Sequence, residues 1–179
     1  HDLEELRQNK NNKEFFQNLF NECSNLMQTI MHLSQPVIAE VCGIAAAAGC
    51  QLVASCDLAV ASENASFMTP GVNIGLFCST PMVAVSRNIS RKKIMEMLLT
   101  GDMIGAQKAT EIGLINNNVP SENLVQETLK LAKKVSSKSS MAQVTGKGIS
   151  FQAVARDRFS NPAKDRNIVV ETSIIQSDA

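Results

Sequence analysis

A stretch of small residues between two apolar segments constrains this chain most. The apolar run Val37–Cys42 contains β-branched residues and predicts a buried strand, which ends at Gly43. Four alanines, Ala45–Ala48, then lead as a tight turn through Gly49 into a segment typical of a buried helix. Because small side chains allow close backbone approach, this strand–turn–helix unit predicts a fold in which helices pack directly on buried strands.

The rest of the chain alternates in the same way. Residues 1–13 are charged and rich in Asn and Lys, which predicts a loop. Helices are expected over 14–35, 80–86, 91–100 (capped by Ser90 and ended by Gly101), 105–112 and 124–135 (capped by Ser121). Extended segments are expected at 58–61, 66–69 and 114–115. Strands separated by helices predict the α/β class.

The helical spacing of apolar residues fades from about Phe151. The pair Asn161-Pro162 interrupts any helix there, since proline lacks an N–H donor and restricts its predecessor. We therefore expect one domain over residues 1–150 and a divergent, poorly packed or disordered tail over 151–179.

Charge and composition exclude some functions. Seventeen basic and 17 acidic residues give a net charge of zero, and only 4% of residues are aromatic, so a nucleic-acid partner is not expected. The longest nearly apolar stretch, Val41–Cys50, is far shorter than the roughly 18 residues of a membrane span.

The cysteines predict neither a metal site nor a disulfide framework. Their number is odd, no CxxC pair occurs and their spacing matches no zinc pattern. Apolar surroundings predict buried, reduced thiols in a reducing compartment. The five are Cys23, Cys42, Cys50, Cys56 and Cys78.

The turn at Gly43–Gly49 is the first candidate for chemistry. A helix that begins there presents backbone N–H groups, which stabilise a phosphate or a developing oxyanion. The segment is neither GxGxxG nor a P-loop. A close-packed crossing of helix and strand explains the same residues without any ligand, so the pattern alone leaves both interpretations open.

A family resemblance extends this interpretation. The run PVIAEVCGIAAAAGCQLVASCDLAVASENASFMTPGVNIG (Pro36–Gly75), followed by KKIMEMLLTGDMIGAQKATEIGLINNNVP (Lys92–Pro120), resembles the crotonase, or enoyl-CoA hydratase/isomerase, superfamily over about residues 1–150. The resemblance implies a spiral of β-β-α turns that binds an acyl-CoA, with coenzyme A as part of the substrate and no separate cofactor or metal. It also implies a chain truncated at its N-terminus, with a helical C-terminal region.

The resemblance assigns site residues. The backbone N–H of Ala48 would form half of an oxyanion hole for the thioester oxygen, and the second donor would lie two positions before His1. The segments that match the family's ligand-binding turns contain Asp2, Leu3, Ala46, Ala47, Ala48, Gly49, Pro70, Gly71 and Gly75.

Two departures from the family pattern concern the acid and base. The glutamates that transfer protons in hydratases of this family fall on Gln51 and Gly71 here. Neither residue relays a proton near neutral pH, and each lost group typically accounts for about 10²–10⁴-fold in rate. We therefore expect hydratase activity to be weak or absent.

Three other residues are candidates to replace these two groups. His32 is interpreted as structural, Asp57 as a partner for backbone N–H groups, and Cys78 as a packing residue, with a weak acid or nucleophile as the alternative.

The expected function is thus an enoyl-CoA hydratase/isomerase-like protein that binds acyl-CoA thioesters in fatty acid metabolism. The alternatives are a non-catalytic regulatory or interaction homologue, and other acyl-CoA chemistry at the oxyanion hole. The resemblance also implies a mitochondrial location and a homo-oligomer, a trimer or hexamer.

Overall fold

The structure of the chain, a computed structural model, describes residues 3–155. It begins with helix α1 (Leu3–Gln8), so the loop expected over residues 1–13 is wrong. The charges explain the helix: Glu4 and Glu5 lie in its first turn and Arg7 in its last, which favours the helix dipole. The Gln8 side chain also donates to Glu4 one turn earlier.

Helix α2 (Lys13–His32) confirms the long helix predicted from the apolar spacing. The Asn12 side chain caps it by accepting a hydrogen bond from the Phe15 N–H at 3.0 Å. Its buried face carries Cys23, Met27 and Ile30, and Cys23 and Met27 pack with Ala48 at the start of helix α3 (Ala48–Ser55).

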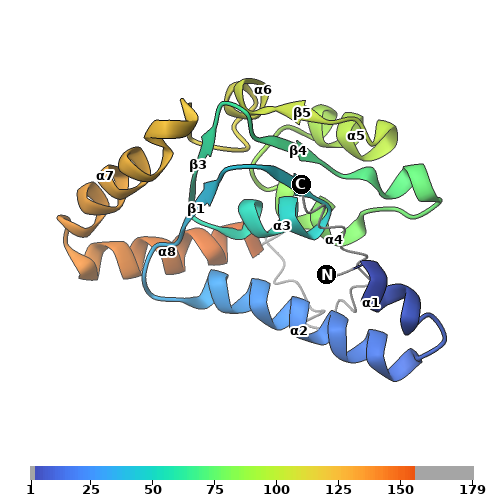
Figure 1. The fold of residues 1–179 in the computed structure, drawn as a ribbon. Coiled ribbons are helices and arrows are strands. Elements are labelled where there is room, and N and C mark those ends of the chain that lie inside the picture. Colours follow the sequence, from blue (N-terminus) through green and yellow to red (C-terminus); the bar gives the residue numbers. More distant parts are fainter. Residues whose placement is uncertain (1–2, 156–179) are drawn as a thin grey trace.

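Two small sheets form the centre of the fold (Figure 1). One contains β1 (Ile38–Val41), β3 (Leu58–Ser62) and β6 (Asn117–Val119), all parallel. The other contains β2 (Ile44–Ala46), β4 (Ser66–Met68) and β5 (Ile104–Gly105), with β5 antiparallel to β4. Strands β1 to β4 alternate between the two sheets, so that β1 pairs with β3 and β2 pairs with β4. This order is the expected β-β-α spiral.

Two strand predictions need correction. The alanine stretch, expected as a turn, contains strand β2, because Ile44, Ala45 and Ala46 pair with β4. Leu114 and Ile115 are buried but are not a strand, since their N–H groups bond to the Ala109 carbonyl at the end of helix α6 (Ala106–Glu111). The strand β6 lies two residues later, in a polar sequence with no apolar run to predict it.

Helices cover the sheets (Figure 1). Helix α3 follows β2, and the 3₁₀ helix η1 (Pro70–Ile74) follows β4. Helices α4 (Ser79–Val85) and α5 (Arg91–Thr100) come next, and α4 packs against α3. Helices α7 (Leu124–Ser136) and α8 (Ser140–Ala155) form the expected helical C-terminal region.

The predicted helix ends are confirmed in part. Gly101 ends α5 with a φ of 69°, as expected. Ser90 occupies the N-cap of α5, although its side chain makes no capping bond. Ser121 is not the cap of α7: it lies in the 3₁₀ turn η2 (Ser121–Asn123), and its hydroxyl bonds to the Ser62 hydroxyl at 2.7 Å.

A compact apolar core fixes the strand–turn–helix unit. Cys50 of α3, Ala61 of β3, Phe67 of β4 and Leu98 of α5 are all fully buried in one cluster. Alanine and cysteine side chains at these crossings hold α3 close to both sheets, as the small-residue pattern predicts.

Lys147 of helix α8 connects this helix to two distant parts of the fold. Lys147 is largely buried and donates to the carbonyls of Ile30 and Gln35 and to the Asp57 carboxylate at 2.7 Å. The helix continues to Ala155, beyond the expected boundary at residue 150. The remainder of the expected tail lies outside the described residues.

The thiol environments differ from the prediction. All five cysteines are free thiols, but only Cys23, Cys50 and Cys78 are buried; Cys42 is exposed and Cys56 is half-buried. Cys42 directly follows the last residue of β1 and is exposed, so an apolar neighbourhood in the sequence did not mean burial. In the described part of the chain, no helix is long and apolar enough to cross a membrane.

Candidate active site at the start of helix α3

The connection between β2 and α3 is a tight turn at Ala47. Its φ of 48° and ψ of −111° lie in a region that L-residues rarely adopt. The turn is held on both sides: the Ala47 N–H donates to the Met68 carbonyl and the Ala47 carbonyl accepts from the Gln51 N–H, both at 3.0 Å. The strained backbone at Ala47 therefore fixes the direction in which helix α3 begins.

Helix α3 presents donors at this turn. The first N–H groups of a helix have no intrahelical acceptor, and here they belong to Ala48, Gly49 and Cys50. Ala48 is 2% exposed, whereas Gly49 is half-buried, and a Cβ at Gly49 would meet no atom within 4 Å. There is thus open space at the Cβ position of Gly49 in this first turn, and the partial positive charge of the helix end favours an oxygen that carries negative charge.

Gln51 lies one turn into the same helix. Its side chain is 6% exposed, and its Oε1 atom has no hydrogen-bond partner among the described residues. A helical side chain leans back toward the helix N-terminus, so the Gln51 amide covers the same first turn.

Gly71, at the second glutamate position, lies in η1 and is buried. Its N–H donates to the Cys78 Sγ at 3.3 Å, and its carbonyl accepts from the Leu76 N–H at 2.9 Å. A Cβ at Gly71 would lie 2.9 Å from both the Cys78 Sγ and the Leu76 carbonyl oxygen. The thiol and the loop backbone therefore fill the space that a side chain at residue 71 would need.

The two buried thiols near this site are poor nucleophiles. Burial, together with a smaller effect of the neighbouring Cys78, raises the pKa of Cys50 to about 12. Burial also raises the pKa of Cys78, although the Gly71 N–H opposes this by stabilising the thiolate. Both groups are neutral thiols at physiological pH, which favours the packing interpretation of Cys78.

The other candidate residues are spread around this turn. Ala46 ends β2, Pro70 begins η1, and Gly75 ends η1 with a φ of 76° that glycine readily adopts. Leu3 begins α1, and Asp2 lies outside the described residues. Spacing gave no indication of two further polar groups: the hydroxyls of Thr69 and Thr80 are buried without a partner in the described part of the chain.

The two structural interpretations from the sequence agree with the contacts. The His32 Nδ1 lies 2.7 Å from the Gln28 carbonyl of the preceding turn. The Asp57 carboxylate accepts from the Val37 N–H at 2.8 Å and pairs with Lys147.

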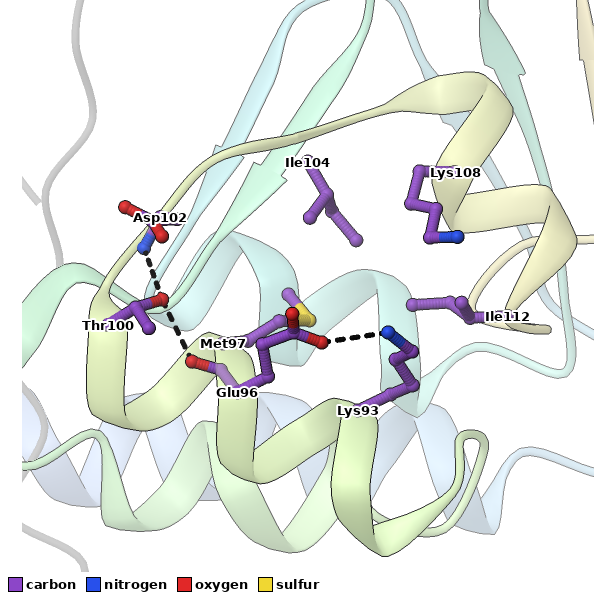
Figure 2. Close-up of a pocket in the computed structure, with 8 residues that line it drawn as sticks. All are labelled: Lys93, Glu96, Met97, Thr100, Asp102, Ile104, Lys108 and Ile112. Atoms are coloured by element: carbon purple, nitrogen blue, oxygen red, sulfur yellow. Dashed lines mark hydrogen bonds and ion pairs between the residues drawn. The ribbon is translucent and has the colours of Figure 1, made fainter.

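A cavity of about 230 Å³ lies elsewhere, between α5, β5 and α6. Figure 2 shows Lys93 and Glu96 of α5 on one side of it and Ile104 and Lys108 on the other. It contains none of the candidate site residues. No group of three or more His, Cys, Asp or Glu side chains within residues 3–155 is placed to hold a metal ion.

Comparison with known proteins agrees with this geometry. A family model described as enoyl-CoA hydratase/isomerase matches residues 1–174. The chain belongs to the enoyl-CoA hydratase/isomerase family. The relatives include mitochondrial enoyl-CoA hydratase domain-containing protein 3 of mouse and of human, each 48% identical over 157 residues, or 88% of this chain. The stretches AAGCQLVASCD and TPGVNIGLFCSTP resemble this protein in particular.

Solved structures of the family share the fold. The crystal structure of the human domain-containing protein 3 has a TM-score of 0.80 at 46% identity, and that of an enoyl-CoA hydratase of Mycobacterium smegmatis has 0.82 at 45%. Both alignments cover 89% of this chain and 62% of the solved chain. The chain spans about half the length, 52%, of the mouse and human relatives. Their names agree with the expected mitochondrial location.

Proposed function

We propose that this chain binds acyl-CoA thioesters and polarises the thioester carbonyl at the start of α3. The observation that carries the proposal is the turn at Ala47, which fixes the start of α3, where the first N–H groups have no intrahelical acceptor and a Cβ at Gly49 would meet no atom within 4 Å. A thioester oxygen gains negative charge when it is polarised, and helix N–H groups stabilise that charge. Family membership supports the choice of ligand.

The same site is poorly equipped to hydrate an enoyl-CoA. Hydration needs groups that take a proton from water and deliver one to carbon. Gln51 and Gly71 occupy the positions at which the family resemblance places those groups, and the nearby thiols have raised pKa values. The function supported best is therefore acyl-CoA binding with weak or absent hydratase activity. A role in fatty acid metabolism belongs to this proposal.

A pair of ligands tests the carbonyl contact. Butyryl-CoA should raise the melting temperature of the full chain, and S-butyl-CoA, a thioether without the carbonyl oxygen, should raise it less. Equal shifts would contradict the proposed contact.

A pair of variants tests the donor. Ala48→Pro removes the N–H at the first helical position, where proline is tolerated, and Ala48→Gly keeps it. We expect the butyryl-CoA shift to be lost in the first and kept in the second. Circular dichroism checks the fold of Ala48→Pro, because Ala47 lacks the extended backbone that usually precedes proline. A folded Ala48→Pro variant with an undiminished shift would contradict the proposal.

We also propose that the chain forms a homo-oligomer with copies of itself. Three neighbouring apolar side chains, Ile74, Leu76 and Phe77, are 59%, 50% and 44% exposed, and such neighbouring groups mark contact surfaces. Light scattering coupled to size-exclusion chromatography tests this: a trimer or hexamer is expected, and a monomer at all concentrations would contradict it.

A further inference from the structure

Positive charge is concentrated in the two C-terminal helices. Residues 128–155 contain five lysines and no aspartate or glutamate, so the other segments of the chain have 12 basic and 17 acidic residues. The net charge of zero therefore hides a separation of charge along the chain, which is typical of contact with a charged partner. Of the five lysines, Lys147 is largely buried against Asp57, and the other four are exposed.

The exposed lysines have few partners within the chain. Lys133, Lys134 and Lys138 form no ion pair with any residue from 3 to 155, and Lys130 pairs with Glu127 at 3.2 Å. The helix dipole explains why lysines lie in the last turn of α7. It does not explain Lys138, which follows the helix end, or the lack of acidic residues in α8. Three cations thus remain available to a partner outside the chain.

Apolar side chains accompany these lysines. Met141, in the first turn of α8, is 75% exposed, more than any other large apolar side chain in the described part of the chain. Val125 and Leu129 of α7 are 56% and 53% exposed. With Lys133 they follow each other at four-residue steps, so the three lie along one side of the helix. Exposed apolar groups beside unpaired cations indicate a partner that is apolar as well as anionic.

The end of α7 and the start of α8 form one corner of the molecule, at the left of Figure 1. Lys138 and Met141 are three residues apart, which is at most about 11 Å even in an extended chain. The Gln143 side chain donates to the Val135 carbonyl and so holds the start of α8 against the end of α7. We define the α7–α8 corner by four exposed residues: Lys133, Lys134, Lys138 and Met141.

The chemistry of the α7–α8 corner selects its partner. Each lysine near an anionic bilayer contributes about fivefold to the affinity. An exposed methionine gains free energy when it enters an apolar phase. The surface of a bilayer with anionic headgroups offers both, because lysines reach the headgroups while an apolar side chain enters the boundary of the acyl chains. Nucleic acid or a soluble polyanion would satisfy the lysines alone.

We propose that the α7–α8 corner binds the surface of a bilayer that contains anionic phospholipids. The three lysines of the corner contact the headgroups, and Met141 enters the boundary of the acyl chains. The chain then lies on the membrane without crossing it. This inference is independent of acyl-CoA binding at the start of α3.

Flotation of the full chain with lipid vesicles tests the inference. We expect binding to vesicles of phosphatidylcholine and phosphatidylglycerol in a two-to-one ratio, and little binding to vesicles of phosphatidylcholine alone. Raising the salt concentration from about 0.1 M to about 1 M should release the chain, because the screening length falls from about 10 Å to about 3 Å. Equal binding to both kinds of vesicle, or binding to neither, would overturn the inference.

Two triple variants test the lysines. Replacing the three lysines of the corner with glutamine should weaken binding to the anionic vesicles about 100-fold. The matched control changes the net charge equally and should bind as the unmodified chain does. It replaces three exposed lysines in other parts of the fold: Lys10, Lys13 and Lys92. Equal losses in both variants would show that net charge decides the binding, and the inference would be wrong.

Two single variants test the apolar contact. Met141→Gln keeps the length of the side chain and its helix propensity, and it should weaken binding about tenfold. Met103→Gln, at a methionine that is 50% exposed before β5, is the control and should leave binding unchanged. If Met141→Gln binds as tightly as the unmodified chain, the corner recognises charge alone and the inference is wrong. If Met141→Gln instead makes the particle smaller in light scattering, the corner is a contact between copies of the chain, which also overturns it.

Discussion

Ala47 combines an unfavourable backbone conformation with a position in the candidate site. Its φ of 48° and ψ of −111° suit glycine, and such conformations at other residues cost about 1–3 kcal/mol. Two backbone hydrogen bonds maintain the turn: the Ala47 N–H donates to the Met68 carbonyl, and the Ala47 carbonyl accepts from the Gln51 N–H. The strain is therefore retained where the helix N–H groups need a fixed direction.

Ala47→Gly should increase the free energy of unfolding by about 1 kcal/mol. The gain is the released strain less the roughly 0.5–1 kcal/mol that glycine costs in chain entropy. Urea unfolding measures it. Ala46→Gly, one residue earlier in β2, is the matched control and should destabilise the protein. A loss of stability in Ala47→Gly comparable to that in Ala46→Gly would contradict a strained turn.

Cys50 predicts a pH dependence of stability. Burial raises its pKa from 9.0 to about 12 in the folded chain. Below pH 9 the thiol is neutral in both states, and its contribution to stability is fully present. Between pH 9 and about 12 the unfolded chain loses the proton first, so stability falls as pH rises.

Cys50→Ala should make stability fall less steeply over this alkaline range than in the unmodified chain. Chemical unfolding at a series of pH values from 8 to about 11 measures the slope. Cys42→Ala, at an exposed thiol, is the control and should leave the slope unchanged. An identical slope in Cys50→Ala and the unmodified chain would show that this thiol does not titrate as described.

At the scale of elements, the packing of η1 against the loop before α4 restricts the size of the side chain that residue 71 can have. Because a Cβ there would lie 2.9 Å from both the Cys78 Sγ and the Leu76 carbonyl, Gly71→Ala should cost about 1–3 kcal/mol of stability. Gly49→Ala is the matched control: its Cβ meets nothing within 4 Å, and alanine favours the helix. Equal stability of both variants by urea unfolding would contradict the close packing.

The contact around Gly71 also determines how the two carboxylates could be restored. The sequence suggests that Gln51→Glu combined with Gly71→Glu would restore both carboxylates. The structure shows that a side chain at residue 71 displaces a backbone carbonyl as well as a thiol, so the second change requires the loop to move. Spacing alone could not show this, because it depends on a contact between residues 71 and 76–78.

Sequence reasoning worked where one local pattern decided the structure. The apolar spacing of α2, the proline and glycine boundaries and the β-branched strands were confirmed. It failed where pairing with a distant strand decided the local structure. The alanine run forms β2 because it pairs with β4, and the polar segment at β6 is a strand because it pairs with β3. The unpaired oxygen of Gln51 likewise depends on which neighbours surround it.

At the scale of the whole molecule, the spiral brings the turn at Ala47, the Gln51 amide and the Gly71 loop into one region through α3 and its packing against α4. The fold presents N–H groups at the start of α3, where we propose that a thioester oxygen binds, and it has no acid or base at residues 51 and 71, where the family resemblance expects them. Under the proposed function, binding and hydration are therefore separate: the start of α3 has the groups proposed for the first, and residues 51 and 71 lack the carboxylates for the second.

Hydration of crotonyl-CoA by the full chain, followed by the loss of the enoyl absorbance, tests this central claim most directly. We predict a rate close to that of the uncatalysed reaction at a concentration of chain that gives a clear acyl-CoA binding signal. Turnover at about 1–10³ s⁻¹, the range typical of enzymes, would contradict the account, because Gln51 and Gly71 would then not prevent hydration.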